Sequence, residues 1–327
     1  MRYLIELSGE SENLAKAEAT ACALNHHGIM SDGRALILES DFSSSELLSR
    51  LALAWSVSDF MFSCKIAELD GHLEKLDLPG KSFRVRTSRL DPIHNPGDGT
   101  KLSRHVGEIL GRRYKVDLVN PDVELRILMS SDIHAGILRG EVDRSAFEAR
   151  KPENRPYKHP ISLHPKLARA LVNLTQVEKN QILLDPFCGT GGILMEAGLI
   201  GCHVLGGDID QRMVDGTLQN LSHFGITNPD IRNLDISEWP KVHEKVHAIA
   251  TDPPYGRSAS TAKEQIGSLY SRTFSTCHAM LKKKGRLAIA LPDEKHITLA
   301  TGFTLEGMYP VRVHRSLTRH FCVFKKV

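Results

Sequence analysis

Short apolar runs in the second half of the chain end, one after another, at aspartates, and this pattern constrains the fold more than any other feature. Three of these runs are Gln181–Leu184, His203–Gly207 and His247–Ala250. Runs this short, bounded by turn residues, are typical of buried parallel strands. Because such strands end at one edge of a doubly wound sheet, chemistry is expected at that edge. A further strand region, between the second and the last of these runs, ends at Asp235. The aspartates at or just beyond the strand ends are thus Asp185, Asp208, Asp235 and Asp252.

The first run opens into the glycine loop Asp185–Gly192, and the helix-like stretch Ile193–Ile200 follows it. Glycines between a strand and a helix let the backbone approach a ligand closely at a helix N-terminus. Asp208, at the second strand end, is positioned for a ribose diol, and Asp235 could accept from an adenine amino group. A nicotinamide-binding fold would share the first two features. Its fingerprint G-x-G-x-x-G does not fit, because Leu194 stands at the third glycine position.

The segment Asp252-Pro253-Pro254-Tyr255, here called the acceptor loop, offers a carboxylate, a proline carbonyl and an aromatic ring. Two successive prolines fix the backbone, so the acceptors are held in place before a ligand arrives. A planar group with an NH₂ could stack on Tyr255 and donate one hydrogen to Asp252 and the other to the Pro253 carbonyl. An exocyclic amine of a nucleobase has these properties. Taken alone, the segment is better interpreted as an ordinary loop that ends a strand, and the glycine loop upstream is what favours a ligand site.

The first part of the chain alternates strand and helix candidates. Strands are predicted at Arg2–Leu7, Arg34–Glu39 and Asp59–Glu68, with helices at Ser11–His26 and Ser44–Trp55. This order suggests a small α+β sandwich of ferredoxin-like type over residues 1–78. Residues 79–140 are predicted to form a second small domain, with strands at Ser82–Arg89, Val123–Met129 and Ile133–Leu138 and a helix at Lys101–Tyr114.

Positive charge is concentrated between Lys81 and Lys115. This window holds nine basic and three acidic residues, whereas the whole chain has a net charge of only +3. A charge run is often just a solvated face, but a local excess also predicts contact with RNA phosphates that weakens with salt. The candidate RNA contacts are Arg84, Arg86, Arg104, Arg112 and Arg113.

Residues 141–158 are polar without a clear apolar stripe, and we predict a linker there. An α/β pattern occupies residues 159–327. After the acceptor loop it predicts a helix at Tyr270–Leu281, a fifth strand at Gly285–Leu291, and a final antiparallel pair at Thr304–Val313 and Thr318–Phe324.

Taken together, these motifs resemble those of class I S-adenosylmethionine-dependent methyltransferases that act on exocyclic amines. The segment Arg155–Pro160, with Leu163–Leu174 after it, resembles the entry helix of the RNA-modifying branch. The closest resemblance is to the archaeal tRNA (guanosine-10, N2) methyltransferase family, whose members carry an N-terminal THUMP region that grips the acceptor end of tRNA. It implies an α/β fold in which ferredoxin-like and THUMP regions precede a Rossmann-like sheet of seven strands.

The resemblance also implies the chemistry and the site. Methyl transfer from S-adenosylmethionine to N2 of guanosine at position ten of tRNA is expected, with Asp252, Pro253, Pro254 and Tyr255 as the catalytic group. The expected cofactor contacts are Asp185, Phe187, Cys188, Gly189, Gly191, Asp208, Ile209, Asp235 and Ile236. A small zinc-binding activator subunit is a further expected partner. An amine methyltransferase for another RNA, for DNA or for protein and a non-catalytic RNA-binding scaffold remain as alternatives.

Composition places the protein in a cell compartment without deciding its function. With 327 residues, 41% of them apolar, the chain is long enough for about two globular domains. No apolar run reaches the roughly 18 residues of a membrane span. The six cysteines show no C-x-x-C spacing, and the histidines show no metal-like pairing, so no metal site is predicted. A reducing cytoplasm is the expected location.

Overall fold

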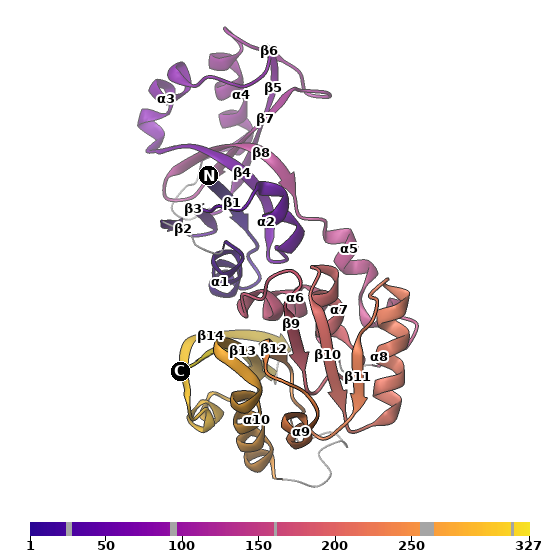
Figure 1. The fold of residues 1–327 in the computed structure, drawn as a ribbon. Coiled ribbons are helices and arrows are strands. Elements are labelled where there is room, and N and C mark those ends of the chain that lie inside the picture. The colour runs from indigo at the N-terminus through magenta and orange to yellow at the C-terminus, as the bar shows by residue number, and fades with distance from the viewer. Residues whose placement is uncertain (24–27, 92–96, 160–161, 256–264, 315–316) are drawn as a thin grey trace. The chain divides into compact units, whose positions relative to one another are not determined.

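The computed structural model describes the chain except residues 24–27, 92–96, 160–161, 256–264 and 315–316. Pro160, the last residue of the entry-helix segment, therefore lies outside the described residues. The chain divides into two compact units, Met1–Val142 and Asp143–Val327 (Figure 1). In the described part of the chain, no helix is both long and apolar enough to cross a membrane.

The first unit is built on one eight-stranded sheet, with strand order β2-β3-β1-β4-β8-β7-β5-β6. Its strands are β1 (Arg2–Leu7), β2 (Ile29–Asp32), β3 (Ala35–Glu39), β4 (Ala54–Cys64), β5 (Ser82–Arg89), β6 (Lys115–Val116), β7 (Val123–Met129) and β8 (Ile133–Glu141). Its helices are α1 (Glu12–Cys22), α2 (Ser44–Arg50), α3 (Leu69–Lys75) and α4 (Gly99–Leu110), with a 3₁₀ turn η1 (Ile66–Glu68). Most pairings are antiparallel, but β5 runs parallel to both β6 and β7.

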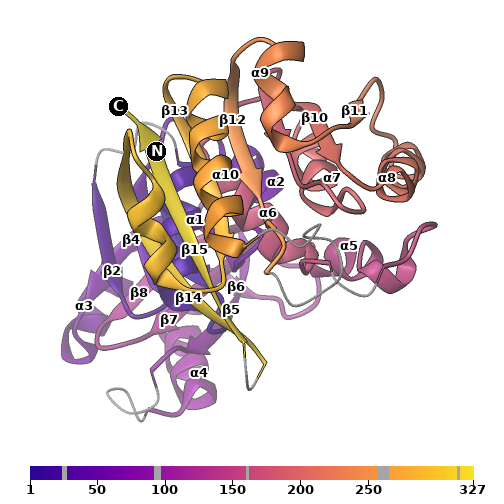
Figure 2. The ribbon, with the colours of Figure 1, turned by 90° about the horizontal axis from the view of Figure 1, so that it is seen from below.

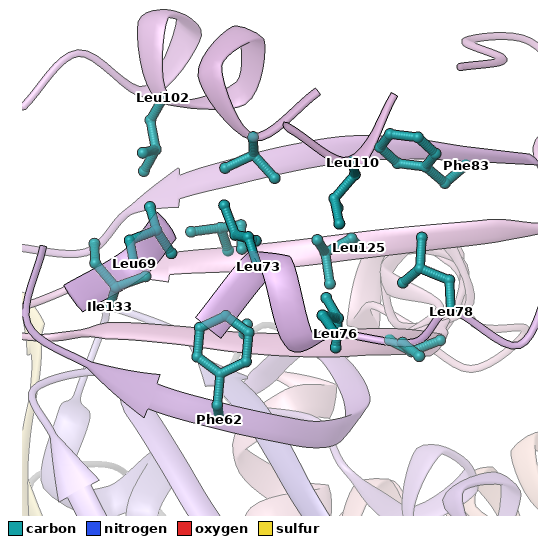
Figure 3. Packing of buried hydrophobic residues seen from close by; sticks show 14 of the residues in the cluster. Phe62, Leu69, Leu73, Leu76, Leu78, Phe83, Leu102, Leu110, Leu125 and Ile133 are labelled. Carbon is teal, nitrogen blue, oxygen red and sulfur yellow. The ribbon is translucent and has the colours of Figure 1, made fainter. Parts of the chain in front are cut away.

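Apolar cores of the first unit contain residues from both sides of the predicted boundary at residue 78. Phe62 from β4 and Leu69 and Leu73 from α3 pack in the same cluster as Phe83 and Leu125, which come from the other side of that boundary (Figure 3). A second cluster likewise joins Leu4, Ala35, Ile37, Leu90 and Leu128. The boundary between residues 78 and 79 is therefore wrong, because separating the chain there would split two shared cores.

Two local predictions in this unit also differ from the structure. The helix predicted at Ser44–Trp55 ends at Arg50, since Leu51 is extended and β4 begins at Ala54. The carbonyl of Trp55 accepts a 2.9 Å hydrogen bond from the amide of Val142, so Trp55 belongs to the sheet. The strand predicted at Asp59–Glu68 ends at Cys64, and η1 follows it. On β5, only Phe83 is buried. Next to β5, the edge strand β6 is only two residues long and covers little of it.

The second unit is built on a seven-stranded sheet with the order β11-β10-β9-β12-β13-β15-β14. Its strands are β9 (Ile182–Asp185), β10 (His203–Asp208), β11 (Asp230–Asn233), β12 (Val246–Thr251), β13 (Leu281–Leu291), β14 (Phe303–His314) and β15 (Leu317–Lys326). Its α-helices are α5 (Arg144–Ala149), α6 (Pro165–Leu174), α7 (Gly192–Leu199), α8 (Gln211–His223), α9 (Trp239–Val242) and α10 (Ile266–Met280). The 3₁₀ turns are η2 (Pro152–Asn154), η3 (Ile236–Glu238) and η4 (Glu294–Leu299).

The strands β9 to β13 are parallel, and β14 and β15 form an antiparallel pair at one end of the sheet. The predicted seven-stranded Rossmann-like sheet is confirmed, and so is its final antiparallel pair. Figure 2 shows this pair at one end of the sheet, with α8 beside β11 at the other.

Helices cover both faces of this sheet, and two adjacent glycines of β10 show why. A Cβ on Gly206 would strike Leu194 of α7, and a Cβ on Gly207 would lie 3.0 Å from the ring of Trp239 in α9. Successive side chains of a strand point to opposite faces. The sheet is therefore the middle of three layers, and the glycines let both helical layers approach it closely.

The predicted linker at residues 141–158 is part of the second unit from Asp143 onward. Glu196, fully buried on α7, is bound by Arg150 at 2.7 Å and by Arg169 at 2.9 Å. Phe147 is buried, with the guanidinium of Arg150 over its ring, and Arg155 is only 2% exposed. The stretch has little apolar content because charge pairing holds much of it in place, and this is why its composition resembles that of a linker.

Candidate active site

The glycine loop joins β9 to α7 in a conformation that only glycine adopts easily. Gly189 has φ = 51° and Gly191 has φ = 80°, both in the left-handed region. A Cβ on Gly191 would also lie 2.9 Å from the side chain of Thr217 on α8. The Thr217 hydroxyl in turn donates a 2.8 Å hydrogen bond to the carbonyl of Gly189. The loop is thus held against α8 and leaves no room for side chains at Gly191.

Asp208 links the second strand end to this loop. Its carboxylate accepts hydrogen bonds from the amides of Gly189 at 3.1 Å and Asp210 at 2.9 Å. Burial raises the pKa of Asp208, and these two bonds oppose the rise. Each oxygen keeps lone pairs for a ligand. The next side chain, Ile209, is 50% exposed although it is apolar.

Asp235 lies at the end of the third strand region, at the start of η3. Its carboxylate accepts a 2.9 Å hydrogen bond from the amide of Ser237 and forms a 2.7 Å ion pair with Arg272 of α10. Burial alone would raise the pKa of Asp235, but the Ser237 amide and Arg272 outweigh it and hold the pKa below its usual value. Ile236 differs from Ile209, because it is buried with 1% exposure and belongs to the core.

Two further predicted cofactor residues line the loop itself. Cys188 is buried, and burial raises the pKa of its thiol, so it is an uncharged packing residue. Phe187 is half-buried, and its amide donates a 3.1 Å hydrogen bond to Asp185. The amide of Cys188 likewise donates within the protein, to the carbonyl of Gly207 at 2.9 Å. Only the carbonyls of these two residues therefore keep capacity for a ligand.

The acceptor loop leaves β12 at Thr251. The Tyr255 hydroxyl donates a hydrogen bond to Oδ1 of Asp252, and Nη1 of Arg319 lies 3.4 Å from Oδ2. The guanidinium of Arg319 also covers the Tyr255 ring at 5.3 Å from its centre. Burial raises the pKa of Asp252, and Arg319 and Tyr255 oppose that rise. Pro253 is buried and Pro254 half-buried. Asp252, Tyr255 and Arg319 form what we call the acceptor cluster.

A hydrogen bond between side chains joins the acceptor loop to the glycine loop. Thr251 donates from Oγ1 to Oδ1 of Asp185 at 2.7 Å, and Asp185 is 1% exposed. Burial raises the pKa of Asp185 to about 7. Because β9 and β12 are neighbouring parallel strands, their ends and the two loops share one edge of the sheet.

Two arginines of this edge, Arg272 and Arg319, were not predicted from the sequence. Neither belongs to a motif, and each reaches its aspartate from an element that follows much later in the chain. The only available signal was a basic residue at the start of the last strand, which is too common to interpret.

The predicted RNA contacts differ from one another in structure. Arg84 and Arg86 both pair with Glu124, and Arg113 donates from Nη2 to the carbonyls of Leu73 at 2.7 Å and Leu76 at 3.0 Å. The remaining two, Arg104 and Arg112, are exposed. In the described part of the chain no contact brings these five side chains to one point, so their contact with RNA stays a prediction.

The residues at the sheet edge fit S-adenosylmethionine. The cradle at Gly191 would be filled by any Cβ, the exposed Ile209 offers an apolar wall, and the carboxylates of Asp208 and Asp235 keep acceptor capacity for a ribose and an amino group. A seven-stranded sheet with these features at the carboxyl ends of its parallel strands defines a class I methyltransferase.

Comparison with known proteins identifies the family. Residues 152–320 match the RMKL-like methyltransferase domain family. Over the full length of both proteins, the chain is 35% identical to the tRNA (guanine(10)-N2)-dimethyltransferase of Methanothermobacter thermautotrophicus. It is 33% identical to the enzyme of that name from Methanocaldococcus jannaschii, covering all of this chain and 90% of the other. The chain belongs to the archaeal tRNA (guanine(10)-N2)-dimethyltransferase family.

The fold also matches that of a solved structure. The crystal structure of TrmN from Thermus thermophilus aligns over all of both chains with a TM-score of 0.57 and 24% identity. This likeness covers both units, so the whole architecture recurs in another protein and not only the methyltransferase sheet.

Proposed function

We propose that this protein transfers methyl groups from S-adenosylmethionine to N2 of guanosine 10 in tRNA, giving N2-methylguanosine and then N2,N2-dimethylguanosine. The observation that carries the proposal is the acceptor cluster, in which Asp252 is fixed at the sheet edge that also holds the glycine loop. The activity for which the full-length archaeal relatives are named supports the same substrate.

Bound S-adenosylmethionine supplies a methyl group that is already electrophilic, because it is attached to a positively charged sulfur. The task of the chain is then to position the two reactants. The backbone at Gly189 and Gly191 would approach the cofactor closely, Asp208 would accept from its ribose, and Asp235 from its adenine amine.

The guanine amine is a poor nucleophile, because its lone pair is delocalised into the ring. Asp252 and the carbonyl of Pro253 would accept its two hydrogens, which raises the electron density on N2 and orients it. Arg319 covers one face of the Tyr255 ring, so the base would stack on the other face. A guanine within a helix would first be turned out of its stack. In the first transfer N2 gains the methyl group and releases one of its two protons, to Asp252 or to solvent. One N–H then remains, and one acceptor suffices to hold it.

The first unit would hold the tRNA. Its basic window would contact phosphates, which positions the RNA without reading its sequence. Arg104 and Arg112 are the exposed cations of that window best placed for this role, whereas Arg84, Arg86 and Arg113 already bind protein groups.

The small zinc-binding activator subunit stays a prediction. Large exposed apolar side chains of the second unit, in its described part, are spread over separate elements and single out no docking surface; they include Leu199, Leu218, Val242 and Leu305. Methylation by the purified protein alone would show that an activator is not required. The cytoplasmic location also stays a prediction.

Mass spectrometry of nucleosides tests the function. Purified full-length protein is incubated with S-adenosylmethionine and a tRNA transcript, and in parallel with the transcript carrying adenosine at position 10. Methylated N2-guanosine should form only in the first, with the dimethylated form appearing later. An equal yield from both transcripts would refute position 10, and methyl groups on duplex DNA would refute the RNA substrate.

Asp252→Asn separates an enzyme from a scaffold. We expect methylation to fall by about 100-fold or more, because an amide cannot supply the same negative acceptor. Asp293→Asn serves as the matched control, because Asp293 caps η4 through a 3.0 Å bond from the Lys295 amide and does not touch the acceptor cluster. Unchanged activity of Asp252→Asn would remove Asp252 from the reaction.

A further inference from the structure

Arg319 is buried at the sheet edge that holds the acceptor loop, and its contacts are not those of an arginine that only stabilises the fold. Its side chain is 8% exposed, yet among the described residues its Nε has no hydrogen-bond partner. The guanidinium faces the carboxylate of Asp252 and the ring of Tyr255. Arg113, by comparison, donates hydrogen bonds from its guanidinium to two backbone carbonyls at the end of a helix. A buried arginine directed at two residues of the acceptor loop is more specific than a packing residue requires.

The topology explains how Arg319 reaches this place. β15 runs antiparallel to β13, with Leu291 opposite His320. The amino end of β15 therefore lies at the carboxyl end of β13, which is the edge where the acceptor loop leaves β12. The reversed last strand thus delivers a cation to an edge that the parallel strands fill with aspartates.

The distance between the Arg319 guanidinium and the Asp252 carboxylate shows that the two are paired without a short hydrogen bond. Nη1 of Arg319 lies 3.4 Å from Oδ2 of Asp252, longer than the roughly 2.7–2.9 Å of a charge-assisted hydrogen bond. Tyr255 binds the other oxygen, Oδ1. Arg319 therefore balances the charge of Asp252 while Oδ2 keeps lone pairs for another donor.

We propose that Arg319 is a positioning residue for methyl transfer, which holds Asp252 as a carboxylate and fixes the Tyr255 ring, so that Oδ2 accepts from the guanine amine. This inference rests on the proposed function and adds to it the residue that prepares the acceptor. A guanidinium suits both tasks, because it is planar and always charged, so it can lie on a ring and pair with a carboxylate at once.

The ionisation of Asp252 depends on the groups that face it from each element around it. They are Tyr255 on its own loop, Asp185 at the end of β9, Tyr270 on α10 and Arg319 on β15. Arg319 is the only cation among these described groups. Its removal should therefore raise the pH at which Asp252 loses its proton, whereas a lysine in its place should not.

The test measures single-turnover methylation of the tRNA transcript from about pH 5 to about pH 9, with saturating cofactor and RNA. Arg319→Gln should lower the rate at neutral pH by about tenfold or more and move the acid limb of the profile up by about 1 unit or more. Arg319→Lys should keep the wild-type midpoint but lose about tenfold at every pH, since it lacks the planar contact with Tyr255.

Arg286→Gln is the matched control. Arg286 lies on β13 of the same sheet and pairs with Glu306 at 2.6 Å. It is opposite Lys325, at the other end of β15 from Arg319. It should leave both the rate and the midpoint unchanged, and a melting curve for each variant checks its fold.

An unshifted midpoint in Arg319→Gln would overturn the inference. Should that variant not fold, Arg319→Lys decides, and a rate within about twofold of wild type would overturn the positioning role. If the wild-type protein does not methylate guanosine, the proposed function fails and the inference fails with it. An active wild-type protein with unresponsive Arg319 variants would refute the inference alone.

Discussion

Thr251 donates a 2.7 Å hydrogen bond to Asp185, and this contact joins the last residue of β12 to the last residue of β9. It places the acceptor loop and the glycine loop side by side at one edge of the sheet. Both partners are buried, so neither can exchange the bond for water without opening the sheet edge. The relative placement of the two loops is thus set by the body of the sheet.

The first prediction concerns Asp185 and pH. Its pKa is about 7 in the folded protein and about 4 in an unfolded chain. Between these values the folded state keeps a proton that the unfolded chain has lost, so this group lowers the free energy of unfolding as pH rises. Asp185→Asn removes that effect. Its stability relative to wild type should increase by about 2–3 kcal/mol between about pH 5 and about pH 7, as measured by urea unfolding. A constant difference across that range would contradict the assignment.

The second prediction concerns the glycine loop. Gly191→Ala forces a side chain into a left-handed backbone and against Thr217 at 2.9 Å. Gly225→Ala is its control, because Gly225 has a similar φ of 74° but open space around it. We expect about 1–2 kcal/mol of destabilisation from Gly225→Ala and more from Gly191→Ala. Only Gly191→Ala should weaken binding of S-adenosylmethionine, which calorimetry reports.

The third prediction concerns the stretch after Asp143. Glu196 is fully buried between Arg150 and Arg169, so Glu196→Ala removes the carboxylate that both guanidiniums share, one of them buried. The free energy of unfolding should fall by about 3–5 kcal/mol. Glu238→Ala breaks an exposed pair with Lys241 and should cost less than about 1 kcal/mol. Equal effects of the two variants would show that residues 143–158 do not depend on this cluster.

The fourth prediction separates two adjacent arginines. Arg112→Ala should weaken tRNA binding without changing stability. The slope of log affinity against log salt concentration should fall by about the share of one phosphate contact. Arg113→Ala should lower the stability of the first unit by about 1–2 kcal/mol, because two carbonyls at the end of α3 lose their donor. Filter binding at several salt concentrations and thermal unfolding measure the two effects. The prediction fails if Arg113→Ala changes only RNA affinity.

The sequence predicted some structural features well. Asp185, Asp208 and Asp252 all lie at one edge of the sheet, as their positions at strand ends predicted. The final antiparallel pair was predicted too, since alternation within a strand is visible in neighbouring residues. The boundary at residue 78 and the linker at residues 141–158 depend on how far a core extends, and there the structure differs from the prediction.

The sequence by itself determined the order of the strands along the chain, the glycine loop and the aspartates, because each depends on residues close together in sequence. Only the tertiary structure decided that Arg319 faces Asp252 and that Arg272 binds Asp235. These pairs depend on the direction in which β15 runs and on where α10 packs. Long-range contacts of this kind follow from the way the whole sheet closes its core, which leaves no signal near either partner.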